Sequence, residues 1–369
     1  MATTYKNPIA FHPGEYLREW LEENNMTSKE LALRLGGKPE KTISNILTGK
    51  SAITPEMAEA LSCVTSVPSR MWNNLQAKYN GCLASQTIGD AHEAQWDTWG
   101  ARFPYKEMVK RGWIPDLSSL GKGEKVRQLL AFLGISHSSS FGMIYGDLLP
   151  QFRLTKGASH DPYATAVWLR QGQILAKQRT LIGQFDREQV QQSIPRLKEV
   201  LMDANQSQGR LEELASELGI ALIILPQLPK ASISGVAMWV GGTPTIVLSG
   251  KGKRHDMFVF NFFHELGHIL LHRGRSQQAR IFVDDASECE GESKEELEAN
   301  AFASDHLIPA SEIAQCALTK AGISQLARRH KVHPCVVLGR LVREKRISWK
   351  LCNSKYKDLN AQTILPSQA

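Results

Sequence analysis

The most informative stretch of the chain is Met257-Phe-Val-Phe-Asn-Phe-Phe-His264-Glu265-Leu-Gly-His268-Ile-Leu-Leu271. Polar residues interrupt its apolar run, which is also shorter than the roughly 18 uninterrupted apolar residues that a membrane span needs. The pattern instead predicts a buried helix. Because buried polar groups are costly without a partner, two histidines and a glutamate on such a helix indicate a metal site.

His264 and His268 are four residues apart, so they lie one turn apart on the same face of a helix and can bind one metal ion. Glu265 lies beside them, where it can accept a proton from a water molecule on the metal. His272 lies one turn further along the helix and is a candidate pocket residue. It either lines the rim of the pocket or stabilises an oxyanion or orients a carboxylate.

A catalytic zinc ion needs a third protein ligand and one open position for water. The metzincin spacing would place a histidine where this chain has Gly274, so that class is excluded. The acidic segment further on supplies three candidates, Glu295, Glu296 and Glu298. Glu296 also completes a capping box with Ser293, so the residues alone leave the choice among the three open.

The histidine helix belongs to a set of four motifs. They are Ile233-Ser-Gly-Val236, Phe263-His-Glu-Leu-Gly-His-Ile-Leu-Leu-His272, Glu296-Leu-Glu-Ala-Asn-Ala-Phe-Ala303 and Leu307-Ile-Pro309. Over about residues 160–350 the chain closely resembles the ImmA/IrrE-type metallopeptidases. The resemblance implies a gluzincin-like zinc metallopeptidase in which His264, His268 and Glu296 bind Zn2+. It also implies that Glu265 is the catalytic acid/base.

A second informative region lies near the N-terminus. Thr27 and Glu30 form a capping box that begins a short helix, and Gly36-Gly37 ends it. Pro39 suits the first turn of the next helix, Glu40–Leu47. Two short helices joined by a tight turn have the helix-turn-helix layout.

The second helix of this pair carries small polar side chains that can reach base edges, and flanking lysines can contact phosphates. The candidate DNA-binding residues are Lys38, Lys41, Thr42, Ser44, Asn45 and Lys50. Residues 1–80 carry nine basic and eight acidic side chains. Binding to DNA therefore requires a local basic patch, because the overall charge of the segment is close to zero.

Four further motifs accompany the two helices. They are His12-Pro-Gly-Glu15-Tyr-Leu17, Gly49-Lys50, Ile53-Thr54 and Trp72-Asn-Asn-Leu-Gln-Ala-Lys-Tyr79. Over about residues 8–80 the chain resembles the HigA-type branch of the Xre/Cro family, which belongs to toxin–antitoxin systems. The resemblance implies a homodimer that binds double-stranded operator DNA, usually at its own promoter.

Three short apolar runs precede the histidine helix, Ala221–Leu225, Ile233–Val240 and Thr245–Leu248. The Gly241-Gly242 link predicts a hairpin between the second and the third. The third run is also a candidate edge strand that could pair with an extended peptide. The predicted fold is mainly α with a small, about three-stranded β-sheet, in which an all-α helix-turn-helix domain precedes an α+β zincin-like metallopeptidase domain.

With 369 residues the chain is too long for one ordinary core. We expect a helix-turn-helix domain at 8–80, a linker and helical connecting region at 81–160, and the metallopeptidase domain at 161–350. The connecting region begins with a polar connector, Gly81–Gly100. The metallopeptidase domain ends in a basic helical subdomain that contains a second helix-turn-helix-like pattern, Ile323–Leu341, which is interpreted as part of the fold.

The six cysteines are scattered without a C-x-x-C pair, and the N-terminus has no apolar signal segment. These features predict reduced thiols, no membrane association and a cytoplasmic location.

The leading hypothesis is a DNA-binding transcriptional regulator whose zinc-dependent peptidase domain cleaves a specific regulatory protein, a repressor or an antitoxin. The alternative is a HigA-like antitoxin or repressor whose zinc domain senses a signal or binds a partner, such as a toxin, without proteolysis.

Overall fold

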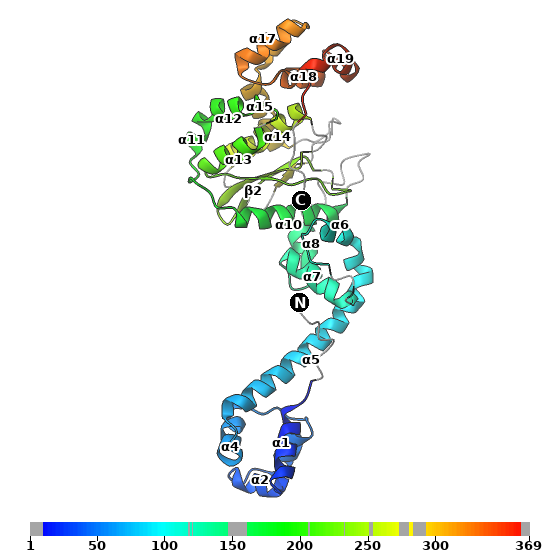
Figure 1. Ribbon diagram of the computed structural model, residues 1–369, viewed down its shortest axis with the longest axis vertical. Helices are drawn as coiled ribbons and strands as arrows, with labels where there is room; N and C mark the ends of the chain where they lie inside the picture. The colour runs from blue at the N-terminus through cyan, green and yellow to red at the C-terminus, as the bar shows by residue number, and fades with distance from the viewer. Residues whose placement is uncertain are drawn as a thin grey trace. The chain divides into compact units, whose positions relative to one another are not determined.

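The computed structural model describes residues 10–116, 119, 121–146, 161–205, 207–231, 233–250, 254–272, 280–282 and 293–362. The chain divides into two compact units (Figure 1). The first comprises Met1–Gly100 and Leu117–Arg127, and the second comprises Ala101–Asp116 and Gln128–Ala369. None of the described helices has the length and apolar character that crossing a membrane requires. The five cysteines within these ranges are all free.

Five helices begin the first unit. They are α1 (Pro13–Glu23), α2 (Ser28–Arg34), α3 (Glu40–Leu47), α4 (Pro55–Thr65) and α5 (Ser69–Thr98). Their apolar faces form one core, with Leu17, Leu31, Ile43, Leu61 and Trp72 buried in it. The predicted helix-turn-helix pair is therefore confirmed as α2 and α3.

The start of α2 follows the predicted capping box. The Thr27 hydroxyl oxygen accepts a hydrogen bond from the Glu30 amide at 3.2 Å. Satisfying this amide matters because the first amides of a helix have no partner within it. The next helix, α3, begins at Glu40 and ends at Leu47, as its sequence predicts.

The segment Gly81–Gly100, predicted to be a polar connector, is helical for most of its length. Helix α5 is a single helix of 30 residues that continues through Thr98. The segment contains no proline, and most of its residues are compatible with a helix. Its hydrophobic periodicity is weak because most side chains between Ala77 and Ala91 are exposed, so this part of the helix needs no apolar face.

The His12-Pro-Gly motif has a packing role at the start of α1. The His12 Nδ1 accepts a hydrogen bond from the Gly14 amide at 2.9 Å, and its ring meets the Tyr79 ring edge-on. A Cβ atom on Gly14 would lie only 1.9 Å from the carbonyl oxygen of Ile46 in α3. A glycine is therefore required for α1 to approach α3 this closely.

Within the described residues, the second unit contains a four-stranded sheet in the order β1-β3-β2-β4. The strands are β1 (Ala221–Ile224), β2 (Gly235–Val240), β3 (Thr243–Leu248) and β4 (Arg280–Phe282). The three predicted strands and the hairpin are confirmed, and β4 is an additional short strand. Strand β3 pairs in parallel with β1 and antiparallel with β2.

The expectation that residues 245–248 form an edge strand is therefore wrong. Both sides of β3 pair with neighbouring strands, and the sheet edges are β1 and β4. Burial explains the difference, because residues 244–248 are all buried between the layers that cover the sheet. An apolar run of this length does not distinguish a central strand from an edge strand.

Helices cover both faces of this sheet, with α10 on one face and α13 and α14 on the other (Figure 1). Before the sheet lie η1 (Gly100–Arg102), α6 (Tyr105–Lys110), α7 (Lys122–Leu133), α8 (Ser139–Tyr145), α10 (Pro162–Gln178), α11 (Arg187–Gln192), α12 (Ile194–Val200) and α13 (Ser207–Glu217). After it lie α14 (His255–Leu271), α15 (Lys294–Leu307), α16 (Ala310–Ala314), α17 (Lys320–His330), α18 (Pro334–Arg343), α19 (Trp349–Lys355) and η4 (Lys357–Leu359).

The second helix-turn-helix-like pattern corresponds to α17 and α18. In α18 the residues from Cys335 to Leu338 are buried in the same core as α14. The early residues of this helix are those that a recognition helix would present to DNA, and here they are not accessible. The pair therefore belongs to the fold of the second unit, as interpreted from the sequence.

We predict that Gly14→Ala loosens the contact between α1 and α3, because the new methyl group would overlap the Ile46 carbonyl. We expect the free energy of local unfolding to fall by about 2 kcal/mol. Hydrogen exchange of the amides of α1 and α3, followed by mass spectrometry, measures this change.

The matched control is Gly81→Ala in α5, where no atom lies within 4 Å of the new methyl group. Alanine should stabilise this exposed helical position by up to about 1 kcal/mol. Equal exchange rates in wild type and Gly14→Ala would contradict the packing role.

Candidate metal centre

The candidate site lies on helix α14, which is buried in the core of the second unit. Nearly all its residues are buried, including His255 at its start and the three polar residues of the motif. The His255 Nε2 donates a hydrogen bond to the Leu201 carbonyl oxygen at 2.7 Å. Burial lowers the pKa of His255, so the ring is neutral near pH 7 and this hydrogen bond fixes the beginning of the helix.

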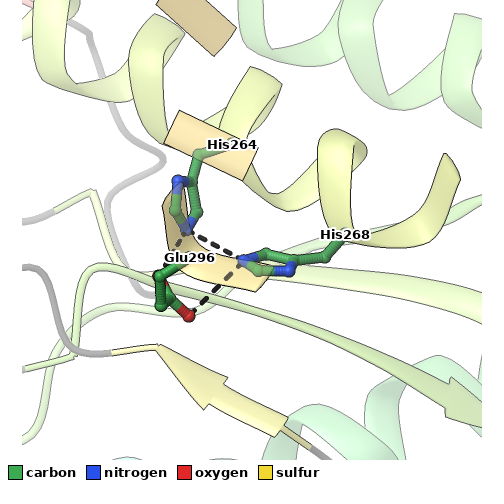
Figure 2. A group of neighbouring side chains, drawn as sticks. All are labelled: His264, His268 and Glu296. Atoms are coloured by element: carbon green, nitrogen blue, oxygen red, sulfur yellow. Dashed lines mark hydrogen bonds and ion pairs between the residues drawn. The ribbon is translucent and has the colours of Figure 1, made fainter. Parts of the chain in front are cut away.

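The two motif histidines point their Nε2 atoms at each other across one helical turn (Figure 2). These atoms are 3.0 Å apart. The Glu296 carboxylate from α15 lies beside both, with one oxygen 3.3 Å from the His264 Nε2 and the other 3.7 Å from the His268 Nε2. Both imidazole side chains are only 4% exposed. The structure therefore brings together three metal-ligand side chains from two helices.

These three side chains form the group of residues, within the described ranges, that could hold a metal ion. In tetrahedral zinc sites the Zn–N distance is about 2.0–2.1 Å, so two nitrogen ligands lie about 3.3 Å apart. The observed separation of 3.0 Å is close to that value. Two imidazoles and one carboxylate also match the donor set of catalytic zinc sites with an open position.

Asn300 orients the first histidine. Its side-chain oxygen lies 3.1 Å from the His264 Nδ1. Because this oxygen only accepts hydrogen bonds, the proton of His264 lies on Nδ1, and the lone pair of Nε2 faces Glu296 and His268. The sequence interpretation gave Asn300 no role, although it lies four residues after Glu296 and therefore on the same face of α15.

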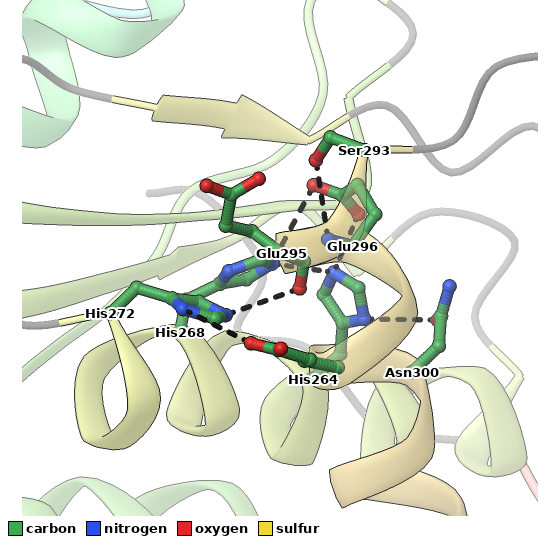
Figure 3. Close-up of polar contacts among 8 residues, drawn as sticks. His264, His268, His272, Ser293, Glu295, Glu296 and Asn300 are labelled. Atoms are coloured by element: carbon green, nitrogen blue, oxygen red, sulfur yellow. Dashed lines mark hydrogen bonds and ion pairs between the residues drawn. The ribbon is translucent and has the colours of Figure 1, made fainter. Parts of the chain in front are cut away.

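Two of the three acidic candidates, Glu295 and Glu296, extend from the start of α15 in different directions (Figure 3). Glu296 directs its carboxylate at the histidines, and its amide donates a hydrogen bond to the Ser293 hydroxyl at 3.3 Å. The Ser293 half of the predicted capping box is therefore present. Glu298 lies 3.5 Å from Lys294, and Glu295 offers its backbone carbonyl oxygen to His272.

Glu265 lies on the same helix as the histidines and is only 2% exposed. Its carboxylate approaches the backbone of β2 at Gly235, where a Cβ atom would lie 2.6 Å from the Glu265 Oε1. The absence of a side chain at this position leaves room for the carboxylate, which would have to shift if a Cβ atom were present. This contact accounts for the glycine of the Ile233-Ser-Gly-Val236 motif, which lies far from the histidines in the sequence.

His272 lies at the C-terminal end of α14, next to the histidine pair. Its ring centroid is 5.3 Å from that of His268, and its Nε2 donates a hydrogen bond to the Glu295 carbonyl oxygen at 3.2 Å. The side chain is 9% exposed. His272 therefore connects α14 to the first turn of α15.

The candidate DNA-binding residues lie in the first unit, on α3 and the turns that flank it. Ile43 and Ile46 are buried in the core, which leaves the opposite face of α3 accessible. The exposed members of the set are Lys38, Lys41, Ser44 and Lys50, and the half-buried members are Thr42 and Asn45.

Both units match known protein families. The family model of the IrrE N-terminal-like domain, peptidase M78, matches residues 215–342, and a helix-turn-helix family model matches residues 17–72. The chain is 41% identical over 76 residues to the uncharacterized HTH-type transcriptional regulator YddM of Escherichia coli K12. That match covers 21% of this chain and 80% of the relative.

Two solved structures are similar to part of the chain. The antitoxin HigA of Pseudomonas aeruginosa, solved with the higBA promoter, is 30% identical, with 22% of this chain and 89% of that chain covered and a TM-score of 0.22. A HigA-family addiction module antidote protein of Coxiella burnetii is also 30% identical, with 23% and 92% covered and a TM-score of 0.22.

The chain belongs to the helix-turn-helix regulators of the Xre type and carries a C-terminal domain of the IrrE/ImmA peptidase family. Peptidases of this family are generally metal-dependent, and the described residues contain a possible metal site in the matched region.

Proposed function

We propose that the protein is a DNA-binding transcriptional regulator whose second unit is a zinc-dependent peptidase that cleaves a specific regulatory protein. The observation that carries this proposal is the convergence of His264, His268 and Glu296 beside the buried Glu265. The functions would divide between residues 8–80, which bind DNA, and residues 161–350, which carry the peptidase. Operator binding would place the protein in the cytoplasm.

The proposed ligands are His264, His268 and Glu296, because they provide two neutral nitrogen donors and a carboxylate within reach of one ion. A bound zinc ion supplies Lewis acidity for peptide hydrolysis. Asn300 holds the His264 ring with Nε2 directed at Glu296, so this nitrogen would be available to an ion. Gly235 leaves room for the Glu265 carboxylate.

Glu265 is the proposed general base and general acid. Its carboxylate would accept a proton from the attacking water and pass that proton to the amine that leaves. Glu265 directly follows His264 on α14, and its burial keeps the carboxylate away from bulk solvent. The substrate would be a repressor or an antitoxin, since the same chain carries a regulator domain of that class.

We predict about one zinc ion per chain in protein purified without chelators, and almost none in His264→Ala, because the variant loses one of two nitrogen donors. Metal content by mass spectrometry measures this. The control is His306→Ala, at an exposed histidine of the last turn of α15. Folded wild-type protein without zinc would refute the zinc-peptidase assignment.

We predict that Glu265→Gln retains zinc but loses hydrolysis by at least about 100-fold, because the amide cannot accept the proton. Such a variant should retain a bound substrate, which can be identified by mass spectrometry of co-purified proteins and then tested for cleavage by wild type. If the captured protein remains intact with wild type, and repression is unchanged in Glu265→Gln, the zinc domain binds a partner without proteolysis.

The first unit is proposed to bind its operator as a homodimer, with α3 as the recognition helix. We predict that Lys41→Gln weakens the binding of the protein to its own promoter DNA. The loss of affinity should be the same for promoter DNAs that differ in base sequence. We also expect the substitution to reduce the slope of log affinity against log salt by about 1, because a lysine–phosphate contact releases counterions.

Titrations at several salt concentrations measure this slope. Lys78→Gln, an exposed lysine on α5, serves as the control and should leave it unchanged. A salt slope in Lys41→Gln equal to that of wild type would show that Lys41 does not contact the phosphate backbone.

A further inference from the structure

His272 makes a contact that the proposed chemistry does not use. Its imidazole Nε2 donates a hydrogen bond to the backbone carbonyl oxygen of Glu295 at 3.2 Å (Figure 3). Glu295 directly precedes Glu296, the proposed carboxylate ligand. The contact thus joins the first residue after α14 to the first turn of α15, next to the proposed metal site.

Glu296 lies where a helix is least constrained. Helix α15 begins at Lys294, so Glu296 is its third residue, and the ends of helices fray. The Ser293 hydroxyl satisfies the Glu296 amide, but this contact lies within the same turn and does not fix the turn relative to α14. The hydrogen bond from His272 comes from the other helix and can fix that relation.

A second polar contact joins the two helices on the other side of Glu296. The Asn300 side-chain oxygen lies 3.1 Å from the His264 Nδ1, one turn further along α15. The proposed ligand therefore lies between two interhelical hydrogen bonds. One of them orients a histidine ligand, and the other holds the backbone beside the carboxylate ligand.

His272 itself does not belong to the group of residues that could hold the metal. Its Nε2 is directed at a carbonyl oxygen, and its Nδ1 lies 3.8 Å from a Glu298 carboxylate oxygen. A ligand would direct one ring nitrogen at the ion, as His264 and His268 do toward Glu296.

We propose that His272 is a positioning residue that holds the Glu295 carbonyl and so directs the Glu296 carboxylate at the metal. The inference rests on the proposed zinc site. Loss of partners that orient metal ligands typically weakens metal affinity by about 10–100-fold. Removing the His272 hydrogen bond should therefore weaken zinc binding by about tenfold without removing any ligand.

Two amide substitutions test the hydrogen bond directly. The amide nitrogen of glutamine can reach the position of the imidazole Nε2, whereas that of asparagine reaches only the position of Nδ1. We expect His272→Gln to bind zinc within about threefold of wild type, and His272→Asn to bind it about tenfold more weakly. Competition with a chromogenic zinc chelator measures both affinities on the full chain. His306→Asn is the matched control and should equal wild type.

A double-mutant cycle separates positioning from a general structural effect. Glu296→Gln weakens the carboxylate ligand, so His272→Asn should have little further effect on zinc affinity in that background. Additive losses would overturn the proposal, because they would mean that His272 acts independently of Glu296. The metal-free forms of His272→Gln and His272→Asn should have equilibrium constants for unfolding within about fivefold of each other, which is about 1 kcal/mol, the net contribution of one hydrogen bond.

The outcomes also distinguish this inference from the proposed function. Wild-type protein that binds no zinc overturns both. Wild-type protein that binds zinc, together with His272→Asn of unchanged affinity, overturns the positioning role alone and leaves the zinc site intact.

Discussion

Two imidazole Nε2 atoms 3.0 Å apart on a buried helix are the constraint on which the second unit depends. Two buried ring nitrogens this close need a cation or a proton between them, because their lone pairs would otherwise face each other without a partner. The fold supplies a carboxylate from a second helix at the same point. Helix α15 therefore meets α14 both at this site and through apolar core residues such as Phe302 and Ala303.

The surroundings of the site show how the fold supports that pair. The absence of a side chain at Gly235 in β2 makes room for Glu265. Asn300 fixes the tautomer of His264, and His272 connects the end of α14 to the backbone beside Glu296. Two of these contacts use an amide side chain and a backbone carbonyl, neither of which carries a charge.

The first unit depends on a different constraint, the close approach of short helices. Helices α1 and α3 approach so closely at Gly14 that no side chain fits between them, and His12 satisfies an amide at the start of α1. Each unit has its own apolar core. The helix-turn-helix and the candidate metal site therefore rest on separate packing, and each half matches its own family over its own range.

The sequence by itself determined the features that depend on local spacing. The four-residue interval places His264 and His268 on one helical face, the Thr27 and Ser293 caps begin their helices, and a glycine pair joins two strands in a hairpin. Such features involve residues a few positions apart, and backbone geometry alone fixes them.

Only the tertiary structure decided the contacts between distant elements. It directs the Glu296 carboxylate at the histidines while its neighbours in the same acidic run make other contacts, and it brings Asn300 to His264. It also places β3 inside the sheet and continues α5 through a polar segment. The physical reason is that these outcomes depend on which surfaces become buried against each other, and local spacing does not encode that.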